Sequence, residues 1–182
     1  MSMKRIPLHI VVALAAVFAV SGLLSSAQAD SDEGAAAENK PLRIERQAFR
    51  LSYPADWKID TEDEDYDPDH LFSVNGPESS FVMFFVYDFA SDPKVNVQAQ
   101  VDAFSDLVLE SKDTRFAKWG NLEGEGVHLR GKIHDLPGGI RIFSHTTDTE
   151  SVTVVAMYFQ EDLDIVTPGF VLIENSFELT AN

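Results

Sequence analysis

The segment SFVMFFVYDF, residues 80–89, decides the fold because apolar residues run through it almost without interruption. Aromatic and β-branched residues follow one another here instead of alternating with polar ones, which is typical of a strand buried on both faces. The segment SVTVVAMYFQ, residues 151–160, has the same character. Two such strands need cover on both faces of their sheet, so we expect helices to pack against it.

The chain between these two segments predicts one helix followed by hairpins. Pro93 marks the start of the helix, since proline suits the first helical turn. Apolar residues at helical spacing form its buried face: Val97, Val101, Phe104 and Val108. Strands are expected at 114–120, 125–136 and 140–147, with turns at LPGG (136–139) and DTES (148–151). Consecutive hairpins favour an antiparallel sheet, because parallel strands need a crossover connection.

The flanking segments complete an α+β fold. AFRLSYP, residues 48–54, alternates apolar and polar residues as a strand does, and a short strand follows at 70–79. Near the C-terminus, Thr167 is expected as the N-cap of a short helix, with Pro168 in its first turn. The fold class is therefore α+β, a mostly antiparallel β-sheet covered by helices in an α/β/α sandwich.

The first 29 residues predict a secretory signal peptide. Lys4 and Arg5 precede an apolar run, and Ala27-Gln28-Ala29 matches a cleavage signature. The alternative is an uncleaved anchor, but the run from residue 10 to 24 is short for a membrane span of roughly 20 residues. We expect a secreted or periplasmic protein without a stable membrane anchor, comprising a disordered acidic leader at 30–41 and a single domain at 42–182.

Charge and composition exclude several classes of function. Cleavage would remove Lys4 and Arg5 but none of the 30 acidic residues, which takes the formal charge from −16 to −18. Such a surface repels nucleic acid, so no nucleic-acid partner is expected. The chain contains no cysteine, which excludes a cysteine nucleophile, thiolate metal ligands and lipidation of a cysteine. It also lacks the G-x-S-x-G, H-E-x-x-H and phosphate-loop motifs, so we expect no catalysis.

The run DTEDEDYDPDH, residues 60–70, is a candidate cation site. Asp63, Asp65, Asp67 and Asp69 match the acidic positions that begin a calcium-binding EF-hand loop. Pro68 stands where that loop needs glycine, and Val74 stands where it needs a bidentate glutamate. Three interpretations stay open: a solvated loop, a weak Ca²⁺ site, and an element that docks on a partner. No other cofactor is expected.

The hairpin at 125–147 carries a candidate binding surface. Alternate residues of its first strand share one face: His128, Arg130, Lys132 and His134. If the loop has an even number of residues, Arg141 and His145 join them, while Leu129 and Ile142 lie on the opposite face. The simplest interpretation is a hairpin whose basic face is only exposed to solvent. The functional hypothesis is that this face binds an acidic group: a partner's carboxylates, a small anion, or the chain's own run at 60–70. The histidines would strengthen such binding at low pH.

Two stretches resemble the PsbP-like fold, which the DcrB-like and Mog-like proteins share. FRLSYPADWKID, residues 49–60, resembles its opening strand, and GFVLIENSFEL, residues 169–179, resembles its closing helix. Together with the elements between them, the resemblance covers residues 42–182.

The resemblance implies a small, non-catalytic accessory protein that binds an unidentified protein partner, and it provides no catalytic residue to carry over. The alternative is an extracytoplasmic domain that binds Ca²⁺ weakly or takes a small ligand. A ligand-binding domain would hold a pocket between sheet and helix, lined by Tyr53, Trp57 or Trp119.

Overall fold

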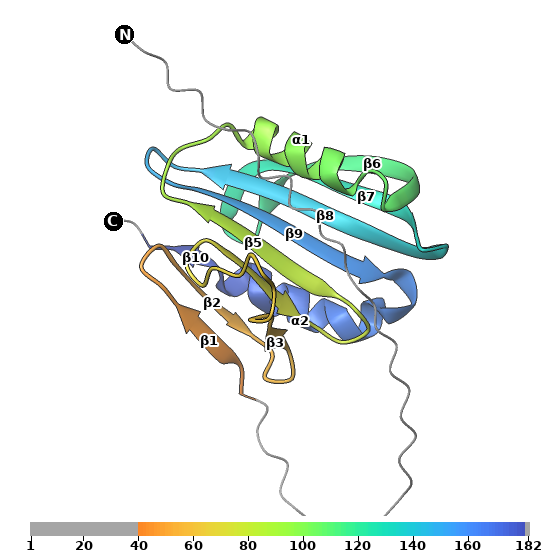
Figure 1. Cartoon of the computed structure of the whole chain (residues 1–182), viewed down its shortest axis with the longest axis horizontal. Coiled ribbons are helices and arrows are strands. Elements are labelled where there is room, and N and C mark those ends of the chain that lie inside the picture. The colour runs from red at the N-terminus through yellow and green to blue at the C-terminus, as the bar shows by residue number, and fades with distance from the viewer. Residues whose placement is uncertain (1–39, 181–182) are drawn as a thin grey trace, which may run out of the picture. The chain divides into compact units, whose positions relative to one another are not determined.

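The computed structural model describes residues 40–180 (Figure 1). The signal peptide expected at 1–29 lies outside the described residues, as does the leader up to residue 39. Neither helix of the described part is long and apolar enough to cross a membrane.

Ten strands and two α-helices make up this part of the chain. The strands are β1 (Leu42–Glu45), β2 (Phe49–Tyr53), β3 (Lys58–Ile59), β4 (Leu71–Asn75), β5 (Phe81–Tyr87), β6 (Val108–Trp119), β7 (Leu122–Ile133), β8 (Leu136–Thr146), β9 (Ser151–Phe159) and β10 (Glu178–Leu179). The helices are α1 (Pro93–Phe104) and α2 (Leu163–Ser176), and a 3₁₀ turn, η1 (Gln160–Asp162), precedes α2.

The strands form two antiparallel sheets. The larger sheet has seven strands in the order β3-β4-β5-β9-β8-β7-β6, and the smaller has the order β1-β2-β10. Every neighbouring pair is antiparallel. The two uninterrupted apolar segments become the adjacent strands β5 and β9 at the centre of the larger sheet, as their double-sided burial requires. The expected α+β class with a mostly antiparallel sheet is confirmed.

The helices cover different faces of the larger sheet (Figure 1). On one face, α1 buries Val97 and Phe104 against residues such as Ile140 and Ile142 of β8. On the other face, α2 and the smaller sheet enclose a second core. Its centre is a stack of four phenylalanine rings, with centroids 4.9 to 6.0 Å apart in the stacked pairs: Phe49, Phe72, Phe84 and Phe177. Successive side chains of β5 and β9 point alternately into the α1 core and the α2 core.

Two glycines admit the ring of Trp57 into the second core. A Cβ atom at Gly169 of α2 would lie 2.2 Å from the Trp57 ring, and one at Gly76 would lie 2.8 Å from it. The ring also packs edge-on against Phe170, with centroids 5.5 Å apart. Close approach at these glycines therefore fixes how α2 packs against Trp57, which directly precedes β3.

Three local expectations are wrong. First, α2 begins at Leu163, so Thr167 is not its N-cap and Pro168 lies inside the helix. Second, α1 ends at Phe104, and Val108 begins β6. Third, the turn between β7 and β8 consists of His134 and Asp135, because Ile133 pairs directly with Leu136. Packing accounts for two of these boundaries: α1 ends at the buried Phe104, and the turn lies where the paired strands keep their apolar faces aligned.

Candidate functional site

The structure brings most of the predicted basic residues to one face of the larger sheet. The two-residue turn gives an even loop, so Arg141 of β8 lies directly opposite His128 of β7. This face also carries the buried Phe143, which belongs to the α2 core. It is therefore a half-buried surface beside α2, and only its outer part on β6 and β7 is exposed to solvent.

Arg141 is held by the protein itself. Its Nη1 donates to the Glu174 carboxylate of α2 at 3.0 Å, and its guanidinium lies 5.3 Å from the centre of the Phe116 ring. The second Glu174 oxygen accepts from the Gly120 amide at 3.1 Å. The side chains of Arg141 and Glu174 are 34% and 20% exposed, so this pair is shielded more than a surface ion pair is.

The remaining basic candidates are spread along the hairpin. Lys132 pairs with Glu110 of β6 at 3.0 Å, and both side chains are exposed. His145 donates from Nδ1 to the Glu123 carbonyl at 2.6 Å. His134 forms half of the turn, with a left-handed φ of 49°. The six predicted residues therefore do not converge on one point. The group that does gather contains His128, Arg130 and Arg141.

His128 shares a hydrogen bond with Tyr158 of β9, at 2.9 Å between Nε2 and the hydroxyl. Burial, together with the nearby positive charges of Arg130 and Arg141, lowers the pKa of His128 from 6.5 to about 4, and burial is the largest of these causes. Burial likewise raises the pKa of Tyr158. The histidine stays neutral well below pH 6.5, so the expectation that acid would add a charge at this position is wrong for His128.

Sequence reasoning missed two members of this group. Tyr158 lies in an apolar strand, and its pattern alone predicts only burial. Lys112 lies on β6, directly opposite Arg130, but the expected strand began only at residue 114. The polar run from Lys112 to Arg115 shows no alternation, so no sequence signal placed Lys112 opposite Arg130.

The acidic run forms a series of tight turns. Asp60, Asp63 and Asp67 each accept a hydrogen bond from the backbone amide two residues later, at 2.9 to 3.1 Å. Such local bonds shape a loop without any ligand. The run turns toward the N-terminal part of the domain, where Arg46 contacts the Asp69 carboxylate at 3.6 Å and the Pro68 carbonyl at 3.1 Å.

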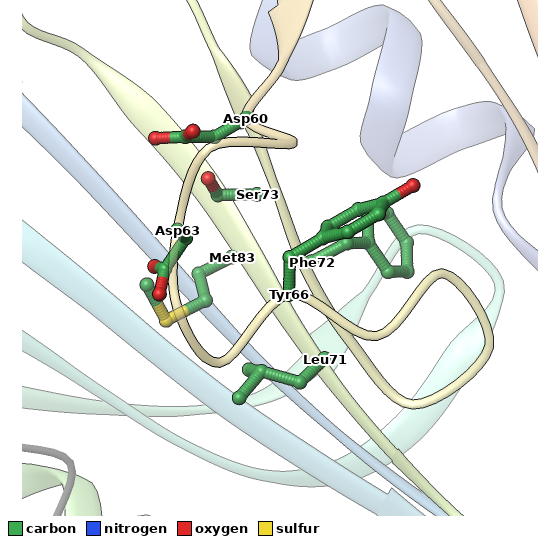
Figure 2. A pocket seen from close by; sticks show the side chains of 7 residues that line it. All are labelled: Asp60, Asp63, Tyr66, Leu71, Phe72, Ser73 and Met83. Carbon is green, nitrogen blue, oxygen red and sulfur yellow. The ribbon is translucent and has the colours of Figure 1, made fainter.

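A hollow of about 10 Å³ lies under the acidic run (Figure 2). Figure 2 shows the carboxylates of Asp60 and Asp63 at its rim, with the ring of Tyr66 directed to the other side. This volume is about that of one water-sized probe. Within residues 40–180, no group of three or more acidic or histidine side chains is arranged to hold a metal ion. The weak Ca²⁺ site at Asp63, Asp65, Asp67 and Asp69 therefore stays a prediction, to be tested by calorimetric titration with millimolar Ca²⁺.

A second hollow, of about 330 Å³, lies on the outer side of the smaller sheet. Its polar groups already have partners: Arg50 pairs with Glu178, and the Ser176 hydroxyl bonds both the amide and the carbonyl of Ser52 at 2.9 and 3.1 Å. The aromatic residues expected to line a ligand pocket lie elsewhere. Tyr53, Trp57 and Trp119 are buried in the α2 core.

A buried hydroxyl network ties α1 to the larger sheet, and no sequence signal indicated it. Ser144 lies at its centre, accepting from Asn96 of α1 at 3.2 Å and from Thr153 at 3.1 Å. Asn96 also donates to Ser91 at 2.6 Å. The groups of this network are hydroxyls, an amide and carbonyls, and none of them is a general base for Ser144. We assign the network a structural role.

No family model and no curated protein sequence matches this chain. Among solved structures, it is similar to cyanobacterial PsbP (CyanoP) from Synechocystis sp. PCC 6803, with TM-score 0.51 and 11% identity over 82% of this chain and 98% of that one. It is also similar to LpqN, involved in cell envelope biogenesis of Mycobacterium tuberculosis, with TM-score 0.50 and 10% identity over 78% and 91%. A protein from Bacteroides thetaiotaomicron VPI-5482 matches with TM-score 0.47 and 12% identity over 74% of this chain and 46% of that one. The first two likenesses show that this chain has a PsbP-like fold.

Proposed function

We propose that this protein is a non-catalytic accessory protein that acts outside the cytoplasm and binds a protein partner. The observation that carries the proposal is the outward side of α2. A helix on the surface of a protein normally presents polar residues to water. Here Ile165 and Val171 are 59% and 48% exposed, and the exposed Pro168 lies between them.

This apolar strip is suited to a protein–protein contact. Interfaces combine an apolar centre with a charged rim. Acidic residues lie at the N-terminal end of the strip, at Glu161, Asp162 and Asp164, and the Arg141–Glu174 pair borders its C-terminal end. We call Ile165, Pro168 and Val171 the α2 strip.

Two further arguments support an extracytoplasmic accessory role. The first 29 residues have the order of a signal peptide. LpqN, whose fold this chain shares, is described as involved in cell envelope biogenesis. We extend the proposal to two finer assignments. The first is a DcrB-like relationship within the PsbP-like fold. The second is an α/β/α sandwich architecture, and the placement of α1 and α2 on different faces of the sheet supports it.

The test is chemical crosslinking in cells that make the protein, followed by purification through a C-terminal tag. Ile165→Gln with Val171→Gln removes the α2 strip, and glutamine is a good helix former, so α2 stays folded. The matched control is Val95→Gln, since Val95 is an exposed apolar residue of α1, 64% exposed. We expect a crosslinked partner with the wild-type protein and the control, and its loss in the double variant. Equal capture by all three, or no partner at all, would contradict the proposal.

A further inference from the structure

Two positive charges face each other on the larger sheet without a compensating acid. Lys112 of β6 lies directly opposite Arg130 of β7. Cβ atoms at such positions are about 5 Å apart, and like charges there destabilise the pair. Among the described residues, no carboxylate forms an ion pair with either of them, and Arg130 donates only to the Thr114 hydroxyl at 3.1 Å.

This arrangement is unexpected in so acidic a chain. The protein has 30 acidic residues and 14 basic ones, so acids are abundant. The neighbouring cations have them: Lys132 pairs with Glu110, and Arg141 pairs with Glu174. The uncompensated pair therefore lies between two cations, Lys132 and Arg141, that are neutralised.

The row of paired residues continues from Lys112 and Arg130 to Gly139 of β8 and then to Tyr158 of β9. Gly139 leaves room for the tyrosine, because a Cβ atom there would lie 2.7 Å from the Tyr158 hydroxyl oxygen. That hydroxyl reaches His128 in the next row, which stays neutral. The Tyr158 hydroxyl thus shares this face with the two cations, and Gly139 leaves the position between Arg130 and Tyr158 without a side chain.

We propose that Lys112 and Arg130, with the Tyr158 hydroxyl on the same face, bind carboxylate side chains from an acidic segment of the protein partner. A guanidinium matches a carboxylate with two parallel hydrogen bonds, and a lysine adds a compact charge. The Arg141–Glu174 pair shows that this face already accommodates a carboxylate. The inference deepens the proposed function and rests on it, because the occupant is a segment of the partner.

Charge complementarity selects this occupant. The net charge of −16 repels extended polyanions such as nucleic acid at long range. Two uncompensated cations suit one or two carboxylates at short range. The chain's own acidic run is engaged elsewhere, since Asp69 contacts Arg46 and Asp60 accepts from Asn75 at 3.2 Å.

The experiment titrates the ¹⁵N-labelled protein with a capped tetraglutamate peptide at low salt, followed by backbone NMR. Arg130→Gln and Lys112→Gln each remove one charge of the pair. Lys58→Gln is the matched control, because Lys58 is an exposed lysine on β3, at the other edge of the same sheet. Since the side chain of Lys112 is exposed and forms no hydrogen bond or ion pair with the described residues, its variant keeps the fold.

We expect peptide-dependent shifts on β6, β7 and β8. The apparent Kd should rise at least fivefold in Arg130→Gln and in Lys112→Gln, and less than twofold in Lys58→Gln. Equal weakening in all three variants would reduce the effect to net charge and overturn the proposal.

Two further readouts identify a wrong occupant. Displacement of the peptide by an equal concentration of inorganic phosphate would assign the face to a small anion. A dimer in sedimentation that Arg130→Gln dissociates would assign it to a second copy. Either result overturns the inference. If the partner of the crosslinking test is captured equally by wild type and Arg130→Gln, the inference fails while the proposed function stands.

Discussion

His128 illustrates how the neighbours of a residue decide its chemistry. The sequence shows a histidine at an alternating position of a strand, and an exposed histidine there would gain a proton near pH 6.5. In the folded protein the ring is half-buried, bonded to Tyr158, and close to Arg130 and Arg141. All of these neighbours come from the pairing of β7, β8 and β9 or from alternate positions on one strand, so the low pKa is a property of the fold.

This pKa predicts a pH dependence of stability. Because the folded-state pKa of His128 is about 4 and the ordinary value is 6.5, the unfolded chain binds more protons between these pH values. The free energy of unfolding should therefore fall as the pH drops from about 6.5 to about 4. We expect a contribution of about 1–2 kcal/mol, because solvent screens a half-exposed ring.

The measurement is urea unfolding at several pH values, compared with His128→Gln, which can still bond Tyr158 but does not titrate. The difference between the two proteins isolates His128 from the many carboxylates that titrate in the same range. A His128 ring signal that titrates near pH 6.5 in NMR would refute the prediction.

At the scale of elements, the β7–β8 hairpin shows where sequence patterns succeed and fail. Alternation of polar and apolar residues placed His128 and Arg141 on one face, and the register agrees. The position of the turn was wrong, because proline and glycine at 137–139 are stronger turn signals than His134 and Asp135. The buried pairing of Leu129 with Ile140 fixes the register, and it leaves only those two residues for the turn.

Asp135 has the larger positive φ of the two residues in this turn. Both turn residues have left-handed backbone angles, with φ of 49° at His134 and 68° at Asp135, as a two-residue hairpin of this type requires. We expect Asp135→Val to lower the free energy of unfolding by about 1–2 kcal/mol, because a β-branched residue fits poorly there. Asp135→Gly should raise it by up to about 1 kcal/mol.

Urea unfolding checks both variants. Asp148→Val is the matched control, since Asp148 is an exposed aspartate in the β8–β9 turn and does not have a positive φ. Its effect should be less than half that of Asp135→Val. Equal effects at the two positions would mean that backbone conformation is not the cause.

The C-terminal helix shows a second limit of local signals. Thr167 and Pro168 form a typical helix start, yet α2 begins four residues earlier at Leu163. Pro168 gives up the hydrogen bond that another residue would make to the carbonyl of Asp164. Burial of Val166, together with the contact of Gly169 with Trp57, holds the extended helix against the core. Tertiary packing outweighs the local preference here.

For the whole molecule, composition and apolar segments predicted more than the charged motifs did. The two uninterrupted strands and the hairpins were enough for the fold class, because burial on both faces admits few arrangements. The acidic run at 60–70 drew attention by its density of carboxylates. Its aspartates instead bond their own backbone, and three-dimensional geometry alone decides that. The uncompensated pair of Lys112 and Arg130 could not be found without the register of β6.

The proposed site of action makes a prediction about the whole chain. If residues 1–29 are a signal peptide, the exported protein starts at Asp30 and loses the two basic residues that precede the apolar run. Expression of the full chain with a C-terminal tag, followed by fractionation and intact-mass measurement, should recover a species lacking residues 1–29 outside the cytoplasm. Replacing Ala27 and Ala29 with larger residues should block cleavage, whereas replacing Ala35 and Ala37 should not, because small residues matter only at the cleavage site. A full-length species held in the membrane fraction of the unaltered protein would support the anchor instead, and the partner would then be sought at the membrane surface.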